Sequence, residues 1–265
     1  MWKSGSDISS ECHRQFTPHT VHDVYRFLLR PRWIGFHLLC LAGIVGMAFL
    51  SAWQFDRLHQ RQDFNADVRS RSTLEPVDVL TLDVSEPSSS AWRAATATGT
   101  YLADEQILIL NRSQGGRAGL NVVTPLLLDD GRAIAINRGF VALDQTPPPP
   151  PSGTVTVGGI LRGSEQRRSG QAREADGELT EMFRLDLDRL ATQVEPELLP
   201  VALLAQASVP ADDPMLQSVP LPELSEGSHL SYAIQWIIFA VCVAVGWVLA
   251  VRRSIKTRAR SRPSA

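Results

Sequence analysis

Two long stretches of the chain contain no Asp, Glu, Lys or Arg, and each is long enough to cross a membrane. They are residues 33–53 and residues 232–251. About 20 helical residues, each rising roughly 1.5 Å, cover the hydrocarbon core of a bilayer. Aromatic side chains, which favour the membrane interface, lie toward the ends of both stretches: Trp33, Trp53, Tyr232, Trp236 and Trp247. The pattern predicts two transmembrane helices.

Between the two stretches, short segments of alternating hydrophobic and polar residues are separated by turn residues. This pattern is typical of β-strands. Glycines at 115–116 and the residues 129–131, Asp-Asp-Gly, predict tight turns that join three strands into an antiparallel meander. The predicted strands are residues 91–101, 107–111, 121–128, 132–141, 155–161, 183–187 and 197–207.

Other segments of the chain are not predicted to be strands. The first helix should continue past the membrane, because Gln54, Arg57 and Arg61 recur at helical spacing, and it should end near Pro76. Residues 147–151 are all proline and predict a stiff extended link. Residues 163–178 are polar and predict an exposed loop. A helix could begin at residues 186–194, capped by Asp186 or Asp188.

The predicted fold class is a membrane-anchored α+β protein, with two transmembrane helices flanking a mostly antiparallel β outer domain. The tail at residues 1–32 is polar and ends in a basic stop, and the tail at residues 252–265 is basic. The predicted organisation is a cytoplasmic tail at 1–32, a first transmembrane helix at 33–53, an extracytoplasmic domain at 54–231, a second transmembrane helix at 232–251 and a cytoplasmic tail at 252–265.

Charge around the second helix sets the predicted orientation. The residues after it are rich in Arg and Lys, whereas the twenty residues before it contain four carboxylates and no Lys or Arg. Positive residues favour the cytoplasmic side, so both termini are predicted to be cytoplasmic. The first helix lacks a suitable cleavage site after it and is predicted to stay as an anchor. A bacterial cytoplasmic membrane is favoured over the mitochondrial inner membrane, because Asp7, Glu11 and Asp23 are unusual in a transit peptide.

Composition excludes several functions. The net charge of −2 argues against nucleic acid as a partner. The cysteines are Cys12, Cys40 and Cys242, so the outer domain can hold neither a disulfide nor a cysteine metal site. Its only histidines, His59 and His229, lie beside the membrane. Hydrolase GxSxG and zinc-protease HExxH motifs are absent, and we expect no enzymatic activity.

Six short segments in fixed order resemble the Surfeit locus protein 1 family, whose members assist assembly of cytochrome c oxidase. The longest is HLSYAIQW at residues 229–236, where the second helix begins. The fifth, NRGFV, differs from the usual family pattern in having Phe140 in place of Trp. The other segments are AWQFDR at 52–57, WR at 92–93 with GTY at 99–101, TPL at 124–126 and DGR at 130–132. The resemblance extends over residues 33–251.

The resemblance implies an assembly factor that binds heme a and presents it to oxidase subunit I, with heme a synthase as a further partner. It places the heme-associated histidine at His229, and a neutral imidazole is a good axial ligand for iron. Tyr232 and Trp236 could flank the macrocycle, and Arg57 and Arg61 could pair with its propionates. Alternatives remain for each residue. The aromatic residues and His229 could be ordinary interfacial anchors, and the arginines could bind lipid phosphate. The competing functional hypothesis is a heme-free scaffold that stabilises oxidase assembly intermediates.

Overall fold

The computed structural model describes residues 26–83, 87–171 and 173–260. The chain divides into two compact units, one made of Met1–Arg61 and Glu226–Ala265 and the other of Gln62–Ser225. Most of the predicted polar tail at residues 1–32 lies outside the described residues. Its described end contains a short 3-10 helix, η1 (Arg26–Leu29), directly before the first long helix.

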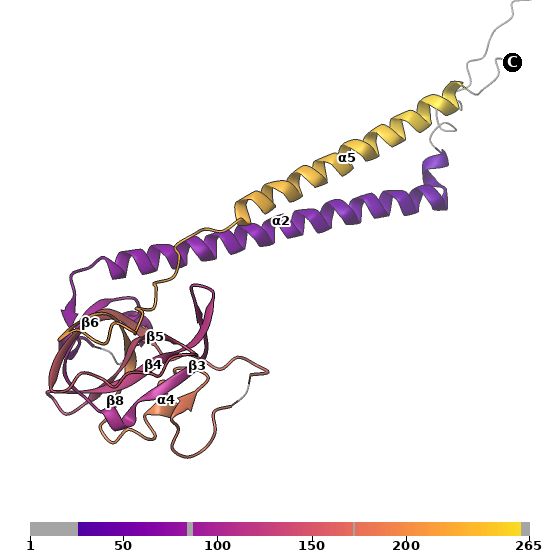
Figure 1. Cartoon of the computed structure of the whole chain (residues 1–265). Helices are drawn as coiled ribbons and strands as arrows, with labels where there is room; N and C mark the ends of the chain where they lie inside the picture. Colours follow the sequence, from indigo (N-terminus) through magenta and orange to yellow (C-terminus); the bar gives the residue numbers. More distant parts are fainter. Residues whose placement is uncertain (1–25, 84–86, 172, 261–265) are drawn as a thin grey trace, which may run out of the picture. The chain divides into compact units, whose positions relative to one another are not determined.

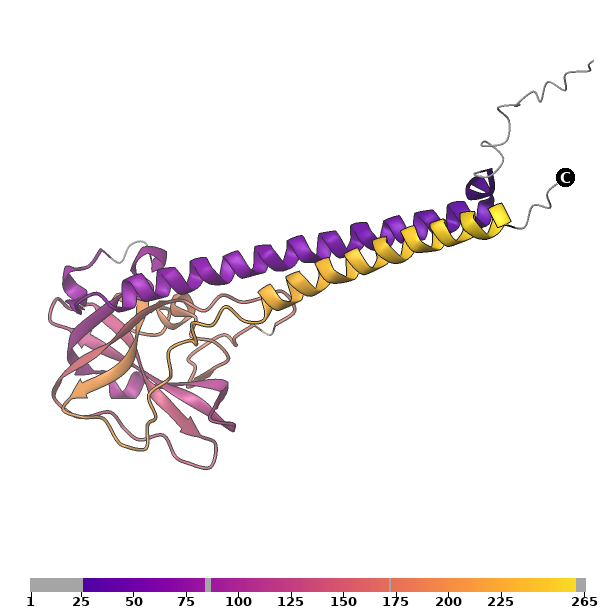
Figure 2. The same cartoon turned by 90° about the horizontal axis from the view of Figure 1, so that it is seen from above.

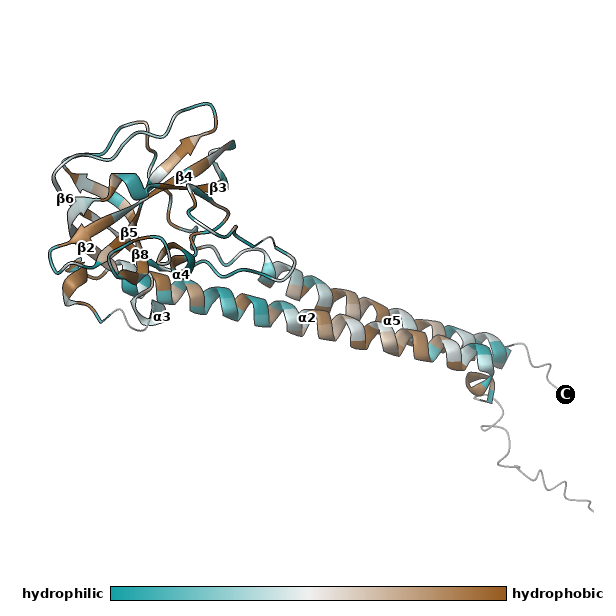
Figure 3. Cartoon of the chain, turned by 90° about the horizontal axis from the view of Figure 1, so that it is seen from below, coloured by the Kyte–Doolittle hydropathy of each residue, from teal (hydrophilic) through white to brown (hydrophobic). Residues whose placement is uncertain are grey.

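Two long helices, α2 (Pro31–Ser72) and α5 (His229–Arg260), carry the apolar stretches. Both are long and apolar enough to cross a membrane, by length and composition. Figure 3 shows hydrophobic middles and more hydrophilic ends in both helices. As predicted, α2 continues well beyond the first apolar stretch and ends before Pro76.

The two helices lie side by side in both Figure 1 and Figure 2, and they run antiparallel. The hydroxyl of Ser51 donates to the carbonyl of Ala233 at 3.1 Å, and Trp247 Nε1 donates to His37 Nδ1 at 2.7 Å. The earlier residue of α2, His37, thus contacts the later residue of α5, Trp247, as expected for antiparallel helices. The more buried residues recur at three- and four-residue spacing, the pattern of helices that pack along a seam. On α5 these are His229, Ala233, Trp236, Ala240, Val243 and Trp247.

The second unit is a small closed β-barrel. Five strands form the ring: β2 (Ala94–Tyr101), β6 (Thr154–Gly163), β8 (Leu198–Val209), β5 (Ala133–Ala142) and β4 (Arg117–Leu128). Pairing of β4 with β2 closes it. The remaining elements are β1 (Val77–Asp78), η2 (Val79–Thr81), α3 (Pro87–Ser90), η3 (Ala103–Glu105), β3 (Ile107–Gln114), β7 (Glu181–Met182) and α4 (Leu187–Leu190).

The predicted mostly antiparallel β domain is confirmed, with three parallel pairings, β1–β2, β3–β7 and β5–β8, among the described strands. The meander of β3, β4 and β5 is confirmed as well. One prediction was wrong in its position: the strand predicted at 183–187 lies at Glu181–Met182, where β7 pairs with the edge of β3. The helix predicted within residues 186–194 is confirmed as the single turn α4, and its cap is Asp186, whose side chain accepts from Arg189 N.

Two hydrophobic clusters occupy opposite faces of the strands. Ile134 and Ile136 of β5 point into the barrel, where they pack with residues of all the other ring strands. Ala133 and Ala135 point outward and lie under α4 and β7. This alternation follows from the two-residue period of a β-strand. The barrel therefore has a filled interior and a second, smaller core on its outside.

Barrel closure depends on a glycine within the GTY segment. A Cβ atom on Gly99 would lie 2.0 Å from the carbonyl oxygen of Leu127 in β4. Such an approach is impossible for any residue with a side chain, so only glycine lets β2 reach β4. Gly139, in the NRGFV segment, has φ of 149°, and a Cβ there would lie 2.8 Å from Gln217 O. The glycines of the GTY and NRGFV segments are therefore required by close contacts with the backbone of neighbouring segments.

Arg138, the neighbour of Gly139, is the centre of a buried polar network. Its side chain has 0 % exposure. Its guanidinium donates to both carboxylate oxygens of Asp212, at 2.8 and 2.6 Å, and to Gln106 Oε1 at 2.9 Å. It also donates to the carbonyls of Pro148 and Pro149 at 3.0 and 2.9 Å. All the N–H groups of the guanidinium are thus satisfied, and the proline link is fixed to the barrel.

Candidate functional site

The predicted site lies where α5 begins. His229 is the first residue of this helix and is half-buried against α2. Its Nδ1 lies 2.9 Å from Gln54 Oε1. An amide oxygen can only accept, so Nδ1 carries the proton and donates. In the neutral imidazole the lone pair is then on Nε2, the tautomer that a metal ligand requires.

A glycine, Gly227, lies beside the Nε2 edge of His229. Gly227 has φ of +68°, a conformation that glycine adopts without strain. A Cβ atom at this position would lie 3.7 Å from Nε2 and 3.5 Å from Cδ2 of the ring. A side chain at this position would therefore contact the metal-binding edge of the imidazole, and glycine adds none. His229 thus fits the role of an axial ligand.

Arg57 and Arg61 leave α2 beyond the bond between Gln54 and His229. Both are exposed. Arg57 donates to Gln60 Oε1 at 2.8 Å, and its guanidinium lies 5.5 Å from the centre of the Trp53 ring. Arg61 follows Gln54 by seven residues, so it projects from the same side of α2 about two turns further on. Both arginines offer N–H donors that an exposed carboxylate could reach.

Tyr232 and Trp236 lie on the same side of α5 as His229 but differ in environment. Trp236 belongs to the seam with α2, is half-buried and packs edge-on against Phe239 at 6.0 Å. Tyr232 lies on the flank of this seam and is 49 % exposed. The structure therefore places His229 and Trp236 along the seam and leaves Tyr232 beside it.

The other end of the helix pair holds a second histidine with the opposite hydrogen bonding. His37 Nδ1 accepts from Trp247 Nε1, so in the neutral ring Nε2 carries the proton. The ring is also surrounded by Trp33 and Phe36, with centroids 5.7 and 6.0 Å away. Neutral His37 therefore has no free lone pair for a metal. Among the histidines facing the helix seam in the described residues, only His229 offers one.

Gln235 and Gln54 show what the sequence leaves open about polar residues in the helices. Gln235, a polar residue inside the apolar stretch, is exposed on the side of α5 turned away from α2. Conversely, the role of Gln54 as the partner of His229 was missed, as was that of Gly227. Gln54 belongs to the AWQFDR segment, which is the signal that could have identified it.

Comparison with known proteins finds relatives over most of the chain. The sequence model of the SURF1 family matches residues 41–241. An uncharacterised SURF1-like protein of Mycobacterium tuberculosis is 29 % identical over 245 residues, 89 % of each chain. A SURF1-like protein of Monosiga brevicollis is 26 % identical, covering 77 % of this chain and 83 % of its own.

A further relative has a function in its name. The cytochrome oxidase assembly protein SHY1 of Saccharomyces cerevisiae is 28 % identical over 104 residues, 38 % of this chain and 26 % of the yeast protein. The family match covers the barrel and parts of both apolar helices, that is, most of the chain. The chain therefore belongs to the SURF1 family, the Surfeit locus protein 1 family.

Proposed function

We propose that this protein is a membrane-anchored assembly factor for cytochrome oxidase, and that it binds heme a and presents it to oxidase subunit I. The yeast relative supports the link to oxidase assembly. The observation that carries the heme proposal is the state of His229, with Nδ1 held by Gln54 and Nε2 beside Gly227. The chain acts as a helper and not as a catalyst.

The remaining site residues fit the two ends of the heme. Its iron would be held by His229, and its propionates by charge-assisted bonds from Arg57 and Arg61. Trp236 and Tyr232 would lie against the ring, and the farnesyl tail would extend into lipid. Heme a, when bound, supplies the redox-active iron that the oxidase requires. The residues of the helix pair bind and orient it at the membrane interface.

Partner contacts are proposed on the outer side of α5. Gln235 is exposed there, within a helix apolar enough to cross a membrane. A carboxamide facing lipid is unfavourable, whereas a hydrogen bond to a neighbouring helix satisfies it. Subunit I or heme a synthase would provide that helix. The second candidate function, a heme-free scaffold, would use the same surface without any role for His229.

Heme binding is tested by purifying the protein in detergent from cells that make heme a. We expect a Soret band that co-elutes with the protein, and no band when the same cells lack heme a synthase. A colourless protein from heme-a-producing cells, combined with loss of oxidase assembly in a deletion strain, would favour the scaffold. Normal oxidase assembly in the deletion strain would contradict both candidate functions.

Orientation in the membrane is the second prediction. We propose a bacterial cytoplasmic membrane with both termini cytoplasmic, because basic residues follow the apolar part of α5 and carboxylates precede it. Alkaline phosphatase, which is active only outside the cytoplasm, should be active when fused after Gly177 and inactive after Ala265. The reverse pattern would place the barrel in the cytoplasm and contradict the orientation.

A further inference from the structure

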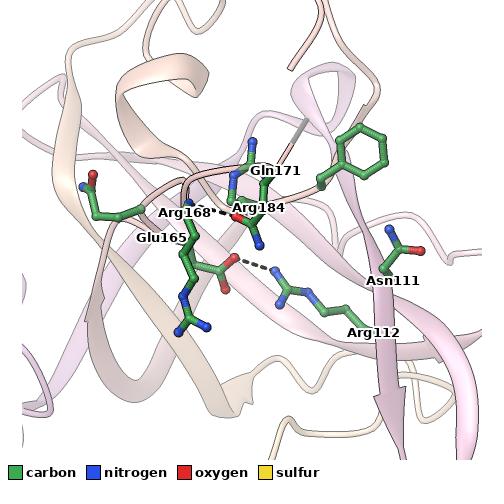
Figure 4. A pocket seen from close by; sticks show the side chains of 8 residues that line it. Asn111, Arg112, Glu165, Arg168, Gln171 and Arg184 are labelled. Carbon is green, nitrogen blue, oxygen red and sulfur yellow. Dashed lines mark hydrogen bonds and ion pairs between the residues drawn. The ribbon is translucent and has the colours of Figure 1, made fainter. Parts of the chain in front are cut away.

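A polar cavity of about 760 Å³ opens on the outside of the barrel, far in sequence from the histidine site. Figure 4 shows its side chains, which come from β3, from the segment after β6 and from the residues after β7. Arginine is the main charged residue type in its wall, with one carboxylate. The lining residues are Asn111, Arg112, Glu165, Gln166, Arg168, Gln171, Phe183 and Arg184.

A second cavity of about 250 Å³ adjoins the first, and Arg112 and Glu165 line both. Its wall adds Asn121 of β4, Asn137 of β5 and Arg162 of β6. Asn121 is 8 % exposed. Asn137 Oδ1 and Arg112 Nε are buried and lack a hydrogen-bond partner among the residues that the structure describes. Buried polar groups of this kind normally have a partner, so their orphaned state points to a missing ligand.

The two cavities are lined by more arginines than carboxylates. Glu165 Oε2 pairs with Arg112 Nη2 at 2.6 Å and also accepts from Leu185 N at 3.1 Å. The guanidinium of Arg168 has no such partner among the described residues. The guanidinium carbon of Arg162 lies over Trp92, 3.7 Å from the ring centre, and burial lowers the pKa of Arg162 although Glu165 acts in the opposite direction. A buried arginine whose charged form is disfavoured in this way is stabilised by a further anion.

Backbone geometry also singles out the entrance. Asn111 has φ of +57°, which is uncommon for a residue other than glycine. It lies where the register of β3 against β4 shifts, between Ile109 and Arg112. Such bulges redirect side chains and are frequent beside functional sites. Here the bulge turns Asn111 and Arg112 toward the cavity.

We propose that this double cavity binds the oxyanion group, phosphate or carboxylate, of a small molecule, with Arg112 and Arg168 as the cationic contacts and the amides of Asn121 and Asn137 as further hydrogen-bond partners. Planar guanidinium groups match the oxygens of either anion in bidentate fashion. Phe183, 41 % exposed at the outer cavity, offers an apolar surface for the rest of such a molecule. The site is independent of the proposed heme site.

Calorimetric titration of the detergent-solubilised full chain tests this proposal. Inorganic phosphate, glycerol phosphate and succinate are titrated separately, with potassium chloride at equal ionic strength as the blank. At least one of the three should bind saturably with a stoichiometry near one. Equal affinity for phosphate and its ester would indicate a free anion, whereas tighter binding of the ester or of succinate would indicate a group carried by a larger molecule.

Three variants locate the binding. Arg168→Gln and Arg112→Gln should each weaken it at least tenfold, equivalent to about 1.4 kcal/mol. Arg168 is exposed, and its guanidinium makes no bond to another described residue, so this change should leave the fold intact. Arg117→Gln is the control, because it removes one arginine charge from the β3–β4 hairpin that also carries Arg112. Neither Arg117 nor its partner Asp144 lines either cavity, so the affinity should change less than twofold.

Two results would overturn the proposal. Heats that do not exceed the chloride blank would mean that water alone fills the cavities. Binding that Arg168→Gln and Arg112→Gln leave unchanged, or that Arg117→Gln weakens equally, would mean non-specific attraction to a positive surface. An acidic peptide that binds while all three small anions fail would identify a protein contact surface instead.

Discussion

Replacement of His229 by alanine should remove most of the heme that co-purifies with the protein. Among the histidines that face the seam in the described part of the chain, only His229 has a ring nitrogen with a free lone pair, because His37 Nδ1 accepts from Trp247. The expected result is loss of the Soret band and lower oxidase maturation, with an unchanged amount of protein in the membrane. Arg57→Ala should weaken heme binding less, since one charge-assisted hydrogen bond contributes about 1.5–3 kcal/mol.

Gln54→Leu tests whether heme binding depends on the hydrogen bond that orients the His229 ring. The change keeps the size of the side chain but removes the acceptor for Nδ1, and loss of such an orienting partner typically costs about 10- to 100-fold in metal affinity. A shifted as well as weakened Soret band would distinguish this effect from general destabilisation.

His59→Ala is the matched control for the loss of a histidine. His59 is exposed and, five residues after Gln54, points to another side of α2. A full Soret band at an unchanged wavelength in His229→Ala would show that His229 is not the ligand, and the heme-free scaffold would become the better proposal.

Replacement of Arg138 by alanine should destabilise the barrel by about 3–5 kcal/mol, the usual effect of removing one partner from a buried ion pair. Asp212, whose side chain is only 17 % exposed, would lose both charge-assisted bonds. Gln106 Oε1 and the carbonyls of Pro148 and Pro149 would lose theirs as well. Since whole domains are stable by about 5–15 kcal/mol, a large fall in the urea midpoint of the β signal in circular dichroism is expected.

The chain supplies a control of the same type. Arg117 and Asp144 also form an ion pair, at 3.0 Å, but their side chains are 50 % and 74 % exposed. Exposed pairs contribute about 0–1 kcal/mol, so Arg117→Ala should barely move the midpoint. Arg138→Lys should recover little, because a single ammonium group cannot reproduce the five directed bonds of the guanidinium. Equal midpoints for Arg138→Ala and Arg117→Ala would contradict a central role for the buried network.

Local pattern alone determined most of the long elements of this protein. Absence of charge over about twenty residues fixes where a helix can enter a bilayer, and two-residue alternation fixes which strand residues face a core. The helix pair, the meander of β3 to β5 and the turns at residues 115–116 and 129–131 were predicted on these grounds. The error at residues 183–187 arose because β7 is defined by its pairing with β3 and not by its own composition.

Contacts between distant residues were decided only by the tertiary structure. Gly99 is required because β2 must approach β4 to close the ring, and nothing in its neighbours along the chain indicates this. Arg138 and Asp212 are 74 residues apart, and Gln54 and His229 are 175 residues apart. The sequence identified His229 as a candidate ligand through its family segment. The partner of His229 decides which ring nitrogen is free, and only folding brings that partner within hydrogen-bonding distance. A hydrogen bond acts over about 3 Å, whereas the periodicity of a sequence reports only on residues that are neighbours in the chain.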